Sequence, residues 1–261
     1  MRPIAFTLGP LTVRWYGVAY AVALIFGLVI LRSEVDRKGL DLDFNDVVDF
    51  FLIVFPLGLV GGRIYYVLFN LGYFLDHPLS IIGLNPGSGF GVSGLAIHGG
   101  LIGGLIGLSV YVKIKDVPFW DFADALAPAL ILGQAIGRVG NFLNGDAYGF
   151  PTDLPWGVRF KANTAGGVKF PDQALHPAML YEMIANLIIF FLLWRLRKRG
   201  YRSGFIISLY FVLYSVGRSV TSVFRAGSLW FGPIRAPHVV SALLVLGFGG
   251  LIYCRRLYRR N

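Results

Sequence analysis

The sequence has one cysteine, Cys254, and few charged residues. Only 15% of its 261 residues are charged, against about 25% in soluble globular proteins. A single cysteine excludes an intramolecular disulfide and a cysteine-rich metal centre. The four histidines, His77, His98, His176 and His238, lie on separate segments without the spacing of metal ligands. We therefore expect no metal site and no cofactor.

Hydrophobic residues, in contrast, make up 56% of the chain, and its mean hydropathy is +0.65. With its flanks, each long apolar run approaches the ~20 residues that a helix needs to cross a bilayer. The sequence therefore predicts an all-α polytopic membrane protein with about seven transmembrane helices, forming a single catalytic domain over residues 1–261. The first run is too long for a signal-peptide core, so we expect it to be a permanent span. The seven runs are 16–31, 50–62, 100–112, 125–137, 183–194, 203–217 and 238–254.

The basic residues, 24 Lys and Arg against 14 Asp and Glu, are unevenly distributed. Most of them fall in alternate loops and after the last run. This pattern is the positive-inside rule, and it places the N-terminus outside and the C-terminus in the cytoplasm. The basic charge therefore reports membrane topology and contact with anionic lipid, and we expect no nucleic-acid partner. Two polar inserts, at about 71–95 and 143–176, are predicted to form a small extracytoplasmic head.

Three arginines, Arg63, Arg138 and Arg218, lie in or at the ends of apolar runs. A central arginine costs roughly 2.5–3.5 kcal/mol on insertion scales, so such residues usually face the bundle interior and find a partner there. Asp146 and Glu182 are the carboxylates at the matching depth. Three cations against two carboxylates leave room for an anionic ligand. The alternative is that the arginines form purely structural ion pairs or extend to the membrane surface.

His98 opens a glycine-rich run in which Gly99, Gly103 and Gly107 recur every fourth residue. Small residues at this spacing let helices approach closely. An ionisable residue in a span is a candidate functional group, and imidazole is suited to general-base catalysis near neutral pH. A nearby G-x-G-x-x-G match, "GFGVSG" at 89–94, follows no predicted strand, so a dinucleotide site is not expected.

Six motifs occur in the order found in prolipoprotein diacylglyceryl transferases, and the chain resembles that family from its first span to its sixth. The two most specific motifs are "HGGLIGG" (98–104) and "GRVGNFLNGDAYG" (137–149). The other four are "RWYGVAY" (14–20), "GGRIYYVLF" (61–69), "HPAMLYE" (176–182) and "YSVGR" (214–218).

The resemblance implies a seven-span enzyme of the bacterial inner membrane that needs no metal. Its partners would be phosphatidylglycerol and the lipobox peptide of a prolipoprotein within the membrane lipids. It would move the diacylglyceryl group to the lipobox cysteine thiol, form a thioether and release glycerol phosphate. The catalytic residues implied are Tyr16, His98, Arg138 and Arg218. The lipid-binding residues are expected to be Arg63, Arg138, Asn141, Asp146, Gly149 and Tyr214.

In this interpretation Arg138 grips the lipid phosphate, Asn141 orients it, Asp146 fixes a neighbouring arginine, and His98 acts as the base. The chain departs from the family pattern at two places, because Asp146 replaces the usual glutamate and Ser222 occupies a slot that is usually acidic. Arg225 fits the arginine that follows this slot.

Two alternatives belong to other classes. A transporter or channel for a small anion would use the same arginines for selectivity. A CDP-alcohol phosphotransferase would need a D-x-x-D-G-x-x-A-R motif, which the sequence lacks.

Overall fold

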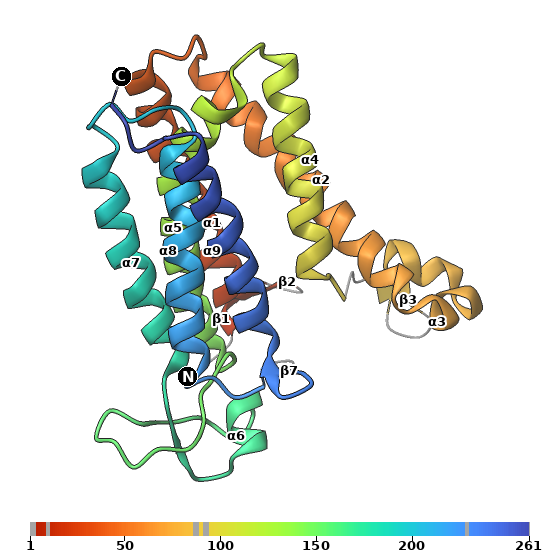
Figure 1. Ribbon diagram of the computed structural model, residues 1–261. Helices are drawn as coiled ribbons and strands as arrows, with labels where there is room; N and C mark the ends of the chain where they lie inside the picture. Colours follow the sequence, from red (N-terminus) through yellow and green to blue (C-terminus); the bar gives the residue numbers. More distant parts are fainter. Residues whose placement is uncertain (1–3, 9–10, 86–88, 91–93, 228–229, 261) are drawn as a thin grey trace. The chain divides into compact units, whose positions relative to one another are not determined.

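The computed structural model describes residues 4–8, 11–85, 89–90, 94–227 and 230–260, and within them seven helices are long and apolar enough to cross a membrane (Figure 1). This confirms the predicted all-α polytopic fold. Most of these helices extend beyond the predicted apolar runs because their first or last turns carry polar residues. They are α1 (Trp15–Lys38), α2 (Phe44–Leu68), α4 (Ile97–Ile114), α5 (Phe119–Asn144), α7 (Ala178–Leu196), α8 (Phe205–Ser222) and α9 (Ala236–Cys254).

In the described part of the chain, short elements precede α1 and follow α2, α5 and α8. Four antiparallel two-stranded ribbons pair β1 (Ile4–Leu8) with β2 (Leu11–Arg14), β3 (Leu84–Asn85) with β4 (Gly89–Phe90), β5 (Val158–Arg159) with β6 (Ala174–Leu175), and β7 (Trp230–Phe231) with β8 (Ile234–Arg235). The predicted insert at 71–95 also holds α3 (Leu71–Asp76) and a 3₁₀ helix, η1 (Pro78–Ile82). The insert at 143–176 also holds α6 (Ala165–Lys169).

The helices belong to two compact units, each described here by itself. The described residues of Met1–Lys38 and Ala123–Asn261 form the large unit, and those of Gly39–Phe122 form the small unit. In the large unit α8 packs between α7 and α9, and in the small unit α2 runs alongside α4 (Figure 1).

The small unit depends on the glycine face of α4. Gly99, Gly103 and Gly107 are buried against α2. A Cβ atom at Gly103 would collide with the carbonyl oxygen of Leu57, because the two backbones are in direct contact there. The predicted close approach of helices along this face is therefore confirmed.

From Ala123 onward α5 belongs to the large unit, and more than half of its apolar stretch is buried. Leu31 of α1, Ile131 of α5, and Met179 and Leu193 of α7 are fully buried in the interior of this unit. At the C-terminal end of α1 the interior becomes ionic, because the buried Glu34 accepts hydrogen bonds from arginines of α1 and of the segment after α7. Apolar packing thus fills the middle of the unit, and polar contacts hold its end.

The contact of Gly99, Gly103 and Gly107 with α2, here called the glycine seam, leads to a testable prediction. We expect Gly103→Ala to lower the free energy of unfolding by about 1–3 kcal/mol, because the added methyl group overpacks a contact between backbones. Gly104→Ala is the matched control, since its Cβ would lie at an ordinary distance of 4.0 Å from Val54 Cγ1. Thermal unfolding in detergent compares the two variants, and equal stability would contradict the seam.

Candidate active site

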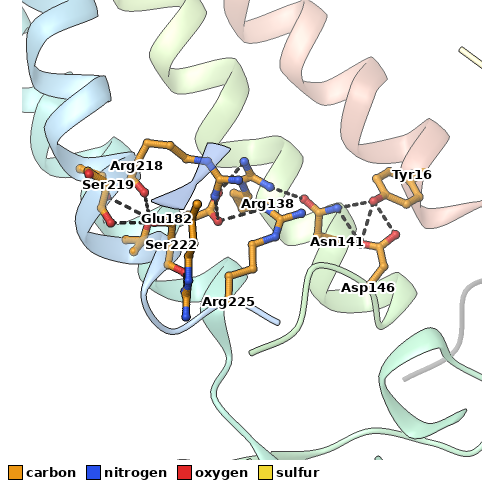
Figure 2. Close-up of polar contacts among 12 residues, drawn as sticks. Tyr16, Arg138, Asn141, Asp146, Glu182, Arg218, Ser219, Ser222 and Arg225 are labelled. Atoms are coloured by element: carbon orange, nitrogen blue, oxygen red, sulfur yellow. Dashed lines mark hydrogen bonds and ion pairs between the residues drawn. The ribbon is translucent and has the colours of Figure 1, made fainter. Parts of the chain in front are cut away.

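Three arginines of the large unit converge on the carboxylate of Glu182, which lies in the first turns of α7 (Figure 2). Arg138 of α5 places Nη2 at 2.5 Å from Oε2. Arg218 of α8 places Nη1 at 2.5 Å from Oε1, and Arg225, three residues after the end of α8, places Nη1 at 3.2 Å from the same oxygen. One carboxylate therefore joins three guanidinium groups that are far apart in the sequence.

The charges of this cluster do not balance. Glu182 supplies one negative charge, and its side chain is 4% exposed, whereas the three arginines supply three positive charges and are each 19–24% exposed. Buried like charges are costly unless they are paired and hydrogen-bonded. The cluster is suited to binding an anion, and guanidinium groups bind phosphate oxygens through paired, charge-assisted hydrogen bonds.

A second polar cluster surrounds Asp146, just beyond the end of α5. The hydroxyl of Tyr16 donates to Asp146 at 2.7 and 2.9 Å, and the amides of Asn141 and Asn144 donate at 2.6 and 2.8 Å. Asn141 also donates to the Tyr16 hydroxyl and accepts a hydrogen bond of 3.2 Å from Arg138 Nη1. Asn141 therefore links the aspartate cluster to the arginine cluster (Figure 2).

The expectation that Asp146 itself fixes an arginine is wrong. Within the described residues its side chain bonds to Tyr16, Asn141 and Asn144, and it reaches Arg138 through Asn141. The chain adopts positive φ on both sides of Asp146, which turns its carboxylate back toward α1 and α5. Of the two carboxylates that the sequence offered as partners, Glu182 is the one that pairs with Arg138 and Arg218 in the described residues.

Gly149 and Tyr214 have structural surroundings that explain their residue types. The N–H of Gly149 donates to His176 O at 2.9 Å, and a Cβ there would lie 2.6 Å from Phe224 O, so the backbone passes too closely for any side chain. Gly149 also forms an isolated antiparallel β-bridge with Arg225, which holds Arg225 near Glu182. Tyr214 stacks on Tyr210 one turn before Arg218.

Two predicted site residues, His98 and Arg63, belong to the small unit. The His98 ring stacks on Tyr65 with centroids 5.8 Å apart. Arg63 donates hydrogen bonds to the carbonyl oxygens of Ile81, at 2.9 Å, and Gly94, at 3.1 Å, and so ties down the insert at 71–95. Their contributions to catalysis and lipid binding stay predictions.

The structure adds a contact that the sequence analysis missed. Ser219 and Ser222 of α8 both face the imidazole of His238, near the start of α9. Ser219 and Ser222 are three residues apart and therefore share a helix face, which was a usable signal for a common partner. The pairing with His238 had no such signal, since it depends on how α9 packs.

The family model described as prolipoprotein diacylglyceryl transferase matches residues 3–254. The chain belongs to this family. It is 40% identical to the phosphatidylglycerol–prolipoprotein diacylglyceryl transferase of Clostridioides difficile, over 100% of this chain and 97% of the relative. It is 38% identical to that of Fusobacterium nucleatum, over 94% and 95%, and 37% identical to that of a Nostoc species, over 97% and 90%.

Membership in the prolipoprotein diacylglyceryl transferase family confirms the predicted transferase class. The match covers nearly the whole chain, including the segments that carry both polar clusters. The alternative of a small-anion transporter or channel is not supported.

The role of Glu182 in this transferase makes a second prediction. We expect Glu182→Gln to lower the free energy of unfolding by about 2–3 kcal/mol, because three guanidinium groups lose their shared counter-charge while they keep some access to water. Added phosphatidylglycerol is expected to raise the melting temperature of this variant more than that of the unaltered protein. Asp153→Asn, at an exposed position of the 143–176 insert, is the control. An unchanged melting temperature in Glu182→Gln would contradict the role.

Proposed function

We propose that the chain, acting over residues 1–261 as one catalytic domain, transfers the diacylglyceryl group of phosphatidylglycerol to the lipobox cysteine thiol of a prolipoprotein. The reaction forms a thioether and releases glycerol phosphate. The observation that carries the proposal is the set of three arginines on one buried carboxylate, which leaves positive charge between membrane-spanning helices of a diacylglyceryl transferase.

The arginine cluster is suited to the bond that breaks. A thiolate is the nucleophile, and it attacks the glycerol carbon attached to the phosphate oxygen. As the carbon–oxygen bond breaks, the electron pair moves to that oxygen and the phosphate gains a negative charge. Arg138, Arg218 and Arg225 stabilise this charge, and Glu182 holds them in place beforehand.

The aspartate cluster orients the groups that hold the lipid. Asn141 accepts a hydrogen bond from Arg138 and is itself held by Asp146 and Tyr16, so the aspartate cluster helps to fix the position of the arginine. We include Gly149, Tyr214 and Arg63 among the lipid-binding residues. Gly149 borders Arg225, and Tyr214 lies one turn before Arg218.

The proposed setting is the bacterial inner membrane, with the N-terminus outside and the C-terminus in the cytoplasm. The basic residues at the ends of α1 and α7 and after α9 support this orientation, because such residues are retained on the cytoplasmic side. Tyr16 and Glu182 lie at the opposite ends of α1 and α7. The arginine cluster then lies in the outer half of the membrane, at the end of the large unit that carries the insert at 143–176.

The first test of the proposal is Arg138→Ala. A lipobox peptide incubated with phosphatidylglycerol and the purified protein should gain the mass of a diacylglyceryl group on its cysteine. We expect Arg138→Ala to abolish this increment, because it removes a phosphate ligand and the donor to Asn141. Arg159→Ala, at an exposed position of β5, should leave it intact. Full transfer by Arg138→Ala would remove this residue from the mechanism.

The second test concerns the base. We expect His98→Ala to lose most of the transfer rate and to keep phosphatidylglycerol binding, since general-base catalysis contributes about 10²–10⁴-fold. The rate is followed by mass spectrometry of the peptide, and lipid binding by the shift in melting temperature. A rate equal to that of the unaltered protein would exclude His98 as the base.

A further inference from the structure

A small cavity lies at the end of the large unit opposite the arginine cluster, where α1 ends and the chain leaves α7. Its volume is about 70 Å³, whereas a single water molecule needs about 10–15 Å³ of such space. The cavity therefore has room for a polar group several times larger than water. Four charged side chains line it: Arg37, Lys38, Asp124 and Arg197.

One carboxylate holds two of these cations in place. Glu34 is fully buried, and it accepts hydrogen bonds from Nε and Nη2 of Arg37 at 3.0 and 2.7 Å. Its other oxygen accepts from Nη1 of Arg197. Arg197 also donates Nε to Trp194 O at 3.1 Å, and its guanidinium lies over the indole ring. Both guanidinium groups are therefore fixed in orientation by the protein itself.

Each of the two guanidinium groups keeps one terminal nitrogen for a further partner. Within the described part of the chain, Nη1 of Arg37 and Nη2 of Arg197 make no hydrogen bond. The Arg197 side chain is only 6% exposed, so an acceptor beside its remaining N–H groups is favourable. An oxyanion that bridges these two nitrogens would satisfy both.

The carboxylate of Asp124 does not oppose an anion in the cavity, because its own charge is matched. Its two oxygens accept from the N–H groups of Gly204 and Ile207, each at 2.9 Å, so it caps the N-terminus of α8. Lys38 Nζ lies 3.5 Å from the oxygen that Gly204 also binds. Asp124 therefore has a structural role and a cation of its own.

The remaining charges leave the cavity positive. Arg37 and Arg197 supply two positive charges against the single negative charge of Glu34. The basic C-terminal segment also reaches this place, because Tyr201, which lines the cavity, forms an isolated antiparallel β-bridge with Arg260. The surplus of positive charge favours an anionic ligand.

The chemistry of the lining favours a phosphate. Guanidinium groups bind phosphate oxygens through charge-assisted hydrogen bonds. Since the oxygens of a phosphate point in different directions, one phosphate can accept from two separate guanidinium groups. Basic pockets between helices on the cytoplasmic side of membrane proteins bind the headgroups of anionic lipids. The proposed orientation puts this end of the large unit on that side.

We propose that the cavity is a second phosphate-binding site, separate from the arginine cluster at Glu182. Nη1 of Arg37 and Nη2 of Arg197 donate to the phosphate oxygens, and Lys38 adds its charge. The phosphate belongs to the headgroup of an anionic phospholipid or to a free ion. Because the site joins the end of α1 to the segment after α7, the bound phosphate stabilises the large unit and takes no part in the transfer reaction.

Thermal unfolding of the full-length protein in detergent tests the inference with two probes. Inorganic phosphate is compared with chloride at equal ionic strength, and micelles that contain phosphatidic acid are compared with micelles that contain phosphatidylcholine. We expect at least one probe to raise the melting temperature by about 5 °C near saturation. A shift with phosphatidic acid alone identifies a lipid headgroup, a shift with inorganic phosphate alone identifies a free ion, and a shift with both shows that either source is accepted.

Two variants of Arg37 assign the shift to the cavity. Arg37→Gln removes one of the two donors and leaves Glu34 its contact with Arg197, so we expect it to remove most of the shift. Arg37→Lys keeps a cation beside Glu34 and has no second nitrogen for the ligand, so it should lose the shift even if Arg37→Gln fails to fold. Arg32→Gln is the matched control, because it loses the same charge from α1 at a residue that pairs with Asp36. It should keep the full shift.

A third variant separates the cavity from the arginine cluster. Arg138→Ala acts at the other end of the large unit, so it should keep the shift that the Arg37 variants lose. A cooperative unfolding transition without any probe shows that each variant is folded. Peptide lipidation is measured on the same samples by mass, and we expect Arg37→Lys to retain it.

Three results would overturn the inference. The first is that neither probe raises the melting temperature of the unaltered protein. The second is a full shift in folded Arg37→Lys, and the third is a shift that Arg138→Ala loses, which would assign the phosphate to the arginine cluster. The proposed function is judged separately, from the mass of the peptide, so either idea can fail without the other.

Discussion

The large unit depends on the ionic contact between Glu182 and three guanidinium groups. Helices α5, α7 and α8 each supply one member, and the chain after α8 supplies the fourth. Because a buried carboxylate and its partners must meet at hydrogen-bond distance, this contact fixes the relative height of the three helices. The surplus positive charge is the reason that we propose the same contact as the binding site of a phosphate-bearing lipid, in which packing and chemistry would share one set of atoms.

The polar groups of the large unit are concentrated at the two ends of its helices. Tyr16 and Glu182 lie at the starts of α1 and α7, while Arg37 and the buried Glu34 lie near the end of α1. From Tyr16 to Arg37 the helix rises about 30 Å, the thickness of the hydrocarbon layer. Between these levels α1 and α7 expose large apolar side chains such as Ile25 and Ile188, so the unit presents charge where headgroups are found and apolar surface where acyl chains are found.

The sequence was sufficient to predict the spans, the glycine seam and most members of the arginine cluster. Hydropathy reports the spans directly, and buried arginines such as Arg138 and Arg218 are conspicuous because lipid makes them costly. The partner of Asp146 was not predictable, since it follows from two residues with positive φ that turn the chain back on itself. The approach of His238 to Ser219 was equally hidden, because it joins two helices through side-chain packing that leaves no periodic pattern.

The bridging amide of Asn141 has a mechanical consequence. Arg138 shares its donors between Glu182 and Asn141, and Asn141 in turn holds the Tyr16 hydroxyl at the start of α1. A ligand that binds Nη1 of Arg138 competes with Asn141 for that donor. Tyr16 and Asn141 keep their direct hydrogen bonds to Asp146, so the start of α1 stays anchored while the arginine turns to a new partner.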